Sequence, residues 1–517
     1  MADGSTPAAQ PQYLTGWALI AMTFGLAIAT FMEVLDITVA NVSLPTIAGD
    51  LAVSPTQGTW VITGYGVANA ITVLLAGWLA ARFGEVRVFT VCALAFGSAS
   101  FLCGWANSLG LLTAFRVLQG AVAGPMVTMS QALLLRNFAP QRRGLAMAIW
   151  GITVVVAPLI GPILGGYITD NYDWRWIFFI NVPIALFAVA AVWQTLHKRE
   201  TEKRRAPVDY VGFWLVVIGV GALQILLDKG KELDWWHSRF IIGLACVSAV
   251  ALSTLIVWEL GERSPVINLR LFTRRNFAVS VTVMAFAYAA MFAGIVLLPL
   301  MLQTQLDYTA TWAGLVVAPV GILSLLLTPI VGPRLPRLNL RLVISVSMVI
   351  FAIAAFWRAR FDTGADYWHL AAPQLLQGAA IAFYFAPLVI LYTADLPPAL
   401  FASASSLMNF TRMLGGAVAT SVVTTLWDER AAVHQTALVE HVTPGAAGFD
   451  AALASLTARG LGSREVGAVI ARNVSQQAYM LAANEVYLWI GVIFLALIGV
   501  IWLARPARPQ AGAVAAH

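Results

Sequence analysis

The sequence predicts an all-α polytopic membrane protein. It has 517 residues, of which 60% are hydrophobic and 11% are charged, whereas a soluble domain carries about 25% charged residues. Its mean hydropathy of +0.80 points the same way. Fourteen apolar runs are long enough to form helices across a bilayer, near residues 17–45, 57–80, 87–105, 109–131, 144–169, 176–196, 210–227, 240–258, 277–302, 311–332, 341–357, 367–394, 399–426 and 486–504.

The charges between these runs predict the orientation of the chain. Cytoplasmic loops of membrane proteins are richer in Lys and Arg than the loops on the other side. Most of the 31 basic residues fall on one side of the membrane if the N-terminus is cytoplasmic. An even number of spans then places both tails, residues 1–16 and 505–517, in the cytoplasm. The first tail contains no Lys or Arg, so it lacks the basic start of a cleavable signal peptide.

The composition and motifs also exclude several classes of protein. The net charge is +6, but the basic residues are scattered between apolar runs, so we expect no nucleic-acid partner. The three cysteines lie in apolar runs and do not form a disulfide framework. No metalloprotease His-Glu-x-x-His motif, Gly-x-Ser-x-Gly elbow or phosphate-binding Gly-x4-Gly-Lys-Ser/Thr loop occurs. We therefore expect no enzyme, no metal site, no cofactor and no direct use of ATP.

A carboxylate inside the first span is the strongest indication of function. Asp36 lies in the run LDITVANVSLP, and a charge near the middle of a spanning helix costs about 2.5–3.5 kcal/mol even on lenient scales. Arg116 lies inside the fourth span, and its approach or withdrawal would switch Asp36 between charged and neutral states. The alternative for Arg116 is a structural anchor. Glu33 shares a helix face with Asp36, either as a second proton carrier, as a contact for cationic substrates or as a carboxyl at the wall of a wet cavity.

Other motifs accompany this pair. Residues 157–166 read APLIGPILGG, which predicts a bent helix that packs closely, since proline removes a backbone hydrogen bond and glycine lets another helix approach. The loop after the second span reads GWLAARFGEVR at residues 77–87. The fourth span continues as RVLQG at residues 116–120, and WRWIFFINVP at residues 174–183 precedes the sixth.

In this order and spacing the motifs resemble the major facilitator superfamily. Within it the chain is similar to the fourteen-span drug/proton antiporters, and in particular to the inner-membrane pumps of Emr-type tripartite multidrug efflux systems. The resemblance implies the major facilitator fold with 14 transmembrane helices. These would form two six-helix bundles, residues 17–197 and 261–504, separated by a basic linker and an inserted helix pair at residues 198–260. Alternating access would then come from rocking of the two bundles around a site near the midplane.

The resemblance also assigns roles to residues. Asp36 and Arg116, with Glu33 beside them, would couple transport to protons. The substrate pathway and gate would involve Asn41, Gln119, Pro158, Gly161, Pro162, Asn409 and Arg412, and the cytoplasmic loop motif would involve Gly77, Arg82, Gly84 and Arg87. The loop departs from the family at Ala81, where an aspartate is usual. Either Glu85 or Arg87 replaces its contact, or the gate is weaker.

The implied function is proton-coupled export of hydrophobic or amphipathic drugs and toxic compounds across the bacterial inner membrane. The alternative is a proton-coupled transporter of a specific metabolite or fatty acid. We expect the long segment 428–484 to lie in the periplasm as short amphipathic helices. It would either dock a periplasmic membrane-fusion adaptor, and through it a TolC-type outer-membrane channel, or act as a passive connector. The remaining expected partners are substrates, protons and membrane lipids.

Overall fold

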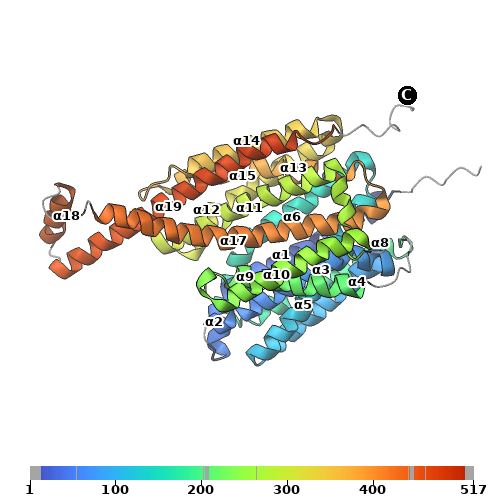
Figure 1. Cartoon of the computed structure of the whole chain (residues 1–517), viewed down its shortest axis with the longest axis horizontal. Coiled ribbons are helices and arrows are strands. Elements are labelled where there is room, and N and C mark those ends of the chain that lie inside the picture. Colours follow the sequence, from blue (N-terminus) through green and yellow to red (C-terminus); the bar gives the residue numbers. More distant parts are fainter. Residues whose placement is uncertain are drawn as a thin grey trace, which may run out of the picture.

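The computed structural model describes residues 13–53, 55–201, 203, 209–262, 265–440, 442, 447–459 and 462–506, and these form helices and their connections. Most of the two predicted tails, residues 1–12 and 507–517, lies outside the described residues. The α-helices are α1 (Gly16–Asp50), α2 (Pro55–Gly58), α3 (Trp60–Phe83), α4 (Glu85–Trp105), α5 (Leu109–Asn137), α6 (Arg143–Asn171), α7 (Trp176–Phe179), α8 (Asn181–Leu196), α9 (Tyr210–Lys229), α10 (Arg239–Gly261), α11 (Arg275–Gln305), α12 (Ala310–Val317), α13 (Pro319–Val331), α14 (Leu340–Arg358), α15 (Tyr367–Ala382), α16 (Phe385–Thr393), α17 (Phe401–Val439), α18 (Ala447–Ala458) and α19 (Ser463–Ile501) (Figure 1).

Many of these helices are suited to a bilayer, which confirms the predicted multi-pass class. Twelve helices of the described part are long and apolar enough to cross a membrane, or thirteen if the bent segment 140–171 is one span. The bend of 44° in that segment falls at the predicted proline and glycine run. α17 is outside the count, because polar side chains such as Asn409 and Arg412 lower its hydropathy. The number fourteen therefore stays a prediction.

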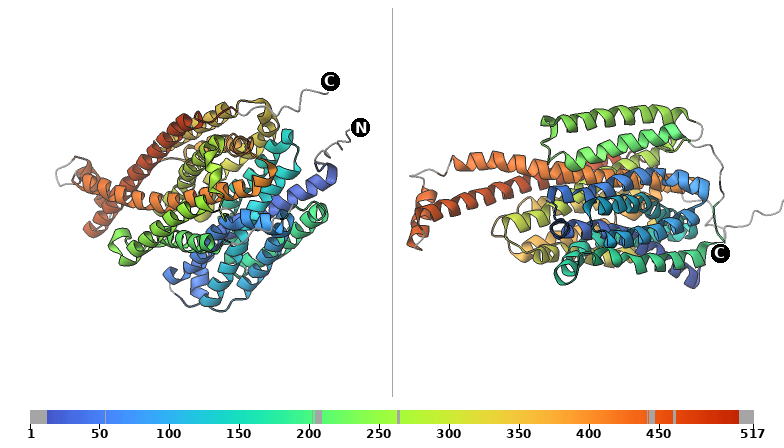
Figure 2. Two further views of the ribbon diagram at one scale, coloured as in Figure 1. Left: turned by 45° about the vertical axis from the view of Figure 1, so that its right-hand side comes forward. Right: turned by 90° about the horizontal axis from the view of Figure 1, so that it is seen from below.

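The long helices have many contacts within each half of the chain, and also contacts between the halves, such as α3 with α17. In the first, α1 packs on α6 and α8, and α4 and α3 pack on α5; we call α1, α3, α4, α5, α6 and α8 the N-terminal group. In the second, α11 packs on α17 and α19, and α15 packs on α13 and α14; we call α11 to α17 with α19 the C-terminal group. α9 and α10 pack on each other, and α9 also contacts α3 and α17. Figure 2 shows this pair, in green, on the outside of the molecule.

Segment 428–484 differs from its prediction. α17 and α19 continue through most of it as long helices and project from the rest of the molecule with α18 at the tip (Figure 1). The expectation of separate short helices is therefore wrong except for α18. The two long helices stabilise each other, because Arg430 Nε lies 2.6 Å from Glu485 Oε2 and Trp427 donates to the Tyr479 carbonyl at 2.9 Å. We call residues 428–484 the helical hairpin.

Candidate functional site

Asp36 is buried in α1 and is contacted by donors from two other helices. Arg116 on α5 forms an ion pair with Asp36 Oδ2, and each side chain is 1% exposed. Asp36 Oδ1 accepts hydrogen bonds from Gln119 Nε2 at 3.1 Å and from Asn181 Nδ2 at 2.8 Å. All three contacts come from donors and occupy three of the roughly four lone-pair positions of the carboxylate.

The chain holds Arg116 in place from several directions. Its Nη1 donates to Gln119 Oε1 at 2.8 Å, and its Nε donates to the Val61 carbonyl at 3.3 Å. Its guanidinium also lies 4.2 Å from the centre of the Tyr65 ring, within the range of a cation–π contact. Gly120, in the next position after Gln119, lets α5 approach, because a Cβ there would collide with a backbone oxygen of α3. Arg116 is thus both an anchor to the backbone and the counter-ion of Asp36.

Glu33 has different partners from Asp36, although both lie on α1. Its Oε1 accepts hydrogen bonds from Asn69 Nδ2 at 2.9 Å and from the Tyr65 hydroxyl at 3.3 Å. Tyr65 therefore links the two acids, since its hydroxyl contacts Glu33 and its ring lies against Arg116.

A cavity of about 540 Å³ lies between the two helix groups and α9. Five of the predicted residues line it: Glu33, Asn41, Pro158, Asn409 and Arg412. Asp36, Arg116 and Gln119 lie behind its wall in the network described above, whereas Gly161 and Pro162 lie further along α6. The structure thus brings Glu33 to the cavity and keeps Asp36 out of it.

On the C-terminal side, the cavity is lined by a buried cation. Arg412 Nη1 donates to the Tyr288 hydroxyl at 3.3 Å, and its guanidinium lies 5.2 Å from the Tyr288 ring centre. No described carboxylate forms an ion pair with Arg412, and its buried Nε lacks a hydrogen-bond partner. One turn away, Asn409 Nδ2 donates to Gln131 Oε1 of α5 at 2.8 Å.

The cavity reaches the surface at the end of the molecule where α1 and α9 end. Asn41, Lys231 and Glu232 line it there and are exposed. Lys231 Nζ lies 2.8 Å from Asp428 Oδ2, which ties the connection after α9 to α17. This end of the cavity is therefore surrounded by charged groups.

At the other end the two helix groups are in direct contact. The Ser406 hydroxyl on α17 donates to the Val73 carbonyl on α3 at 2.5 Å. Nearby, a Cβ on Gly77 would lie only 2.8 Å from the Ser403 Cα, so a side chain at position 77 would separate the helices. The predicted loop-motif glycine thus permits closure at this end.

The rest of the loop motif forms a capped turn between α3 and α4. Gly84 has a φ of +96°, a conformation that favours glycine, and a Cβ there would collide with the Glu200 carboxylate. Glu200 accepts hydrogen bonds from the backbone nitrogens of Val86 at 3.1 Å and Arg87 at 3.0 Å. A carboxylate from the linker therefore caps the start of α4, where the helix dipole favours negative charge.

The same turn holds Glu85 and Arg87, the two side chains considered as replacements for a carboxylate at position 81. Glu85 is buried and lies 3.6 Å from Arg136 on α5, so Glu85 rather than Arg87 ties this loop to α5. The Arg87 side chain is exposed, and its Nε lies 4.0 Å from Glu200 Oε2. Arg82 lies 5.7 Å from the Trp78 ring centre.

Two of the three glycines in the α6 run face α1. A Cβ on Gly161 would collide with the Thr38 hydroxyl, and one on Gly165 would lie 3.1 Å from the Val39 Cα. These positions therefore pack inside the N-terminal group, beside the helix that carries Asp36.

Our reading of the sequence missed three side chains of this site: Asn181, Tyr65 and Asn69. Each is a polar group in an apolar span, and Tyr65 and Asn69 are one turn apart on α3. That spacing was a usable signal. Asn181 lies in the quoted WRWIFFINVP motif, but nothing in the motif shows that its amide reaches Asp36.

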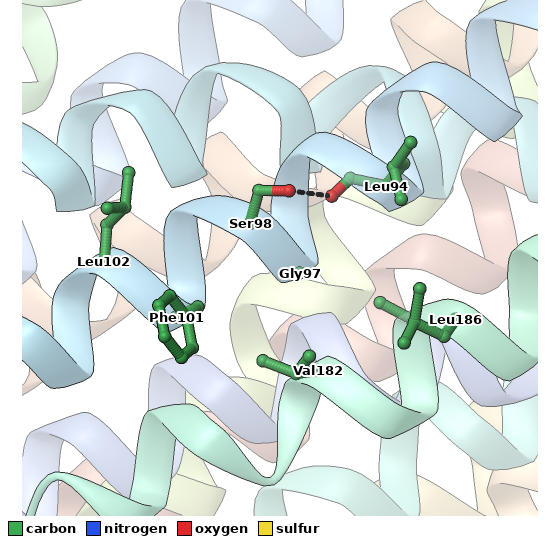
Figure 3. Close-up of a pocket in the computed structure, with 8 residues that line it drawn as sticks. Leu94, Gly97, Ser98, Phe101, Leu102, Val182 and Leu186 are labelled. Atoms are coloured by element: carbon green, nitrogen blue, oxygen red, sulfur yellow. Dashed lines mark hydrogen bonds between the residues drawn. The ribbon is translucent and has the colours of Figure 1, made fainter.

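A separate hollow on the outside of the N-terminal group is apolar. Figure 3 shows it between α4 and α8, and its cavity volume is about 340 Å³. Its one hydroxyl, on Ser98, donates to the Leu94 carbonyl at 3.0 Å (Figure 3). The side chains around it include Leu94, Phe101, Leu102, Val182 and Leu186. A hollow without charge on the outside of a membrane-spanning chain is suited to lipid chains rather than to coupling chemistry.

Comparisons with known proteins agree with the predicted family. Residues 26–420 match the family described as the Major Facilitator Superfamily. The chain is 48% identical over 498 residues to the "Multidrug export protein EmrB" of Escherichia coli (strain K12), covering 96% of this chain and 97% of that protein. It is 45% identical over 499 residues to the "Fatty acid resistance protein FarB" of Neisseria gonorrhoeae, covering 96% and 98%.

Solved structures agree on the fold alone. The human organic anion transporter MFSD10 has a TM-score of 0.57 at 11% identity, covering 93% of this chain and 99% of that one. The proton:xylose symporter XylE also has a TM-score of 0.57, at 14% identity, with coverage of 94% and 95%.

Proposed function

The chain belongs to the major facilitator superfamily of membrane transporters, and we propose that it is a proton-coupled antiporter that exports hydrophobic and amphipathic drugs. Its similarity to a multidrug export protein over nearly the whole length supports this substrate class. We further propose the fourteen-span arrangement, in which α17 and α6 each cross the membrane. The N-terminal and C-terminal groups would be the two six-helix bundles, and α9 and α10 the inserted pair.

The observation that carries the proposal is the connection between the cavity and the buried ion pair. Glu33 lines the cavity, the Tyr65 hydroxyl donates to Glu33, and the Tyr65 ring lies against Arg116. A proton or a cationic substrate at Glu33 would change the position of Tyr65, and hence how Arg116 holds Asp36. Coupling requires such a contact between the substrate site and a proton-binding group.

The packing at the two ends supports alternating access. With the N-terminus in the cytoplasm, the open end of the cavity faces the periplasm, and the closed end at Gly77 and Ser406 faces the cytoplasm. The structure would then be an outward-open state. We propose that Asp36 receives a proton from the periplasm as Arg116 withdraws, and that the proton leaves to the cytoplasm after the bundles rock.

The test is uphill transport in liposomes with an imposed pH gradient. We expect the purified protein to accumulate a cationic amphipathic dye only when the gradient is present. Glu33→Gln keeps the shape of the side chain and its contact with Asn69, but it removes the charge, and we expect it to lose uphill transport. Ser98→Ala, in the apolar hollow of Figure 3, is the matched control and should transport normally. Dye accumulation by the wild type without a gradient would contradict proton coupling.

We also propose that the helical hairpin docks a periplasmic adaptor, and through it a TolC-type outer-membrane channel. The hairpin extends beyond the rest of the molecule and holds an apolar groove of about 350 Å³ near its tip. An apolar surface outside the membrane is typical of a protein interface. Without an outer channel, an exported hydrophobic drug would be released into the periplasm and could partition straight back.

The groove gives a sharp test of docking. Gln435 and Val474 line the same groove, so the ends of a deletion of residues 436–475 lie close together and a short Gly/Ser bridge can join them. The shortened protein should keep transport in liposomes but lose drug resistance in cells and adaptor co-purification. Ile470→Asp, in the groove, should likewise lose drug resistance and adaptor co-purification. Val433→Asp, exposed outside the groove, should keep both. Full resistance with the deletion would show that the hairpin is a passive connector.

Fatty-acid export is the second candidate function. The similarity to a fatty acid resistance protein favours it, as does Arg412, a buried cation at the cavity that has no direct ion pair with a described carboxylate. A fatty-acid carboxylate would pair with Arg412. Arg412→Gln should then weaken export of a medium-chain fatty acid more than export of a cationic dye, whereas equal losses would favour a purely structural role.

A further inference from the structure

The C-terminal group contains a second buried arginine, which the function proposed above does not use. Arg358 is the last residue of α14 and is 4% exposed. Its Nη2 donates to Gln374 Oε1 at 2.8 Å and also to Gln377 Oε1. No described carboxylate forms an ion pair with it. An arginine keeps its charge in proteins, and an uncompensated buried charge is strongly unfavourable.

The side chains around Arg358 have hydrogen-bonding atoms to spare. Among the described residues, four buried atoms of this cluster lack a partner: Arg358 Nε, Gln374 Nε2, Gln377 Nε2 and the Tyr487 hydroxyl. Each of these atoms can donate a hydrogen bond. Because both glutamine oxygens face the guanidinium, the two amide nitrogens are the groups left free. Buried polar atoms in proteins almost always have partners, so this cluster calls for an acceptor, and the charge of Arg358 favours a negative one.

An internal repeat indicates where the missing negative charge belongs. Residues 115–121 on α5 read FRVLQGA, and residues 373–379 on α15 read PQLLQGA. Gly120 and Gly378, the glycines of the two copies, have the same packing role. A Cβ on Gly120 would collide with a backbone oxygen of α3, and a Cβ on Gly378 would collide with a backbone oxygen of α13. The two copies therefore occupy matching places in the two helix groups.

In the N-terminal copy this motif surrounds the carboxylate of Asp36 on α1. The matching helix of the C-terminal group is α11, which packs on α17 and α19 as α1 packs on α6 and α8. Opposite Arg358, α11 has Gly294, and a Cβ built there would lie 3.1 Å from Arg358 Nη1. The second copy thus has Gln374 in place of Arg116 and takes its arginine, Arg358, from α14. It has no side chain where α1 presents its carboxylate.

We propose that this cluster binds a small monovalent anion, chloride under physiological conditions, beside Gly294. The anion would neutralise Arg358 and accept the free hydrogen bonds, as the carboxylate of Asp36 does for Arg116. The connection from α14 to α15 begins directly after Arg358, so the cluster lies at the end of this span and not at its middle.

Chloride binding by the full-length purified protein in detergent is the direct test. We expect radioactive chloride to bind at one site per chain. Exchange of gluconate, which is too large for the site, for chloride should raise the thermal unfolding midpoint by at least about 2 °C. Arg358→Gln should lose both effects. Wild-type protein that binds no chloride and unfolds at the same temperature in both salts would overturn the proposal, and water would then satisfy the cluster.

A designed carboxylate makes the test specific to Gly294. Gly294→Asp supplies the negative charge from α11, so this variant should no longer bind chloride and should unfold at one temperature in both salts. Gly294→Asn has nearly the same size without the charge and is the matched control. In gluconate this control should unfold at a lower temperature than Gly294→Asp. Equal behaviour of the two variants in gluconate would overturn the assignment of this position. Should neither variant fold, the Arg358→Gln binding measurement decides alone.

Discussion

Replacing Asp36 by asparagine should separate the structural role of the buried ion pair from its role in coupling. The substitution leaves the charge of Arg116 without its partner in a place where the side chain is 1% exposed. Removing one partner of a buried ion pair typically costs about 3–5 kcal/mol. The amide oxygen of the introduced asparagine can still accept from Asn181 or Gln119, whose bonds to Asp36 are 2.8 and 3.1 Å long. The loss should therefore come mainly from the unpaired guanidinium.

This reasoning predicts that a second substitution repairs the first. In the double variant Asp36→Asn with Arg116→Gln, no charge is left buried, so we expect at least about 2 kcal/mol of the lost stability to return. Unfolding of the four proteins in the same detergent gives the coupling energy. Uphill drug transport in liposomes should be absent in both single variants and also in the repaired double variant. Position 36 no longer carries a proton in the two variants that contain Asp36→Asn, and the counter-ion is gone in the Arg116→Gln single variant.

Two results would refute the argument. The first is a loss of unfolding free energy in the double variant that equals the sum of the losses in the two single variants within about 0.5 kcal/mol, which would mean that Asp36 and Arg116 do not stabilise each other. Wild-type uphill transport by Asp36→Asn would remove this carboxyl from the coupling mechanism, whatever its effect on stability.

Three further substitutions test the packing around this site. Arg116→Lys should keep part of the transport that Arg116→Ala loses, because a point charge can still pair with the carboxylate but cannot reproduce the planar fork; transport by the alanine variant at the wild-type rate would make Arg116 an anchor only. Gly77→Val should separate α3 from α17, since even a Cβ would lie 2.8 Å from the Ser403 Cα. Ser403→Cys should then be labelled faster by a thiol reagent, at an unchanged folded yield. An unchanged labelling rate would contradict the separation. Gly161→Leu should collide with Thr38 on α1 and lower folded yield and transport together, whereas a loss of transport alone would place Gly161 at a moving interface.

The sequence alone was sufficient for the class of protein and for the centre of the site. A chain with so few charges must satisfy its backbone hydrogen bonds within helices once it is in lipid, so the apolar runs predict the helices. Asp36 and Arg116 could be identified because a charge in such a run is too costly to be incidental. The bend in α6 followed from its prolines and glycines. The hairpin was expected as short amphipathic helices, because the sequence does not show that α17 and α19 pair and so continue beyond the membrane.

The tertiary structure decided which side chains meet. Asn181 is 145 positions from Asp36 along the chain, and no local pattern can show that their helices are neighbours. Glu33 and Asp36 share a helix face by spacing, yet one lines the cavity and the other pairs with α5, because the rotation of α1 against its neighbours sets their surroundings. Arg358 lies at the end of a span, where the sequence gives no sign that it is buried. The periodicity of a helix fixes which residues share a face, but the packing of other helices determines what that face meets.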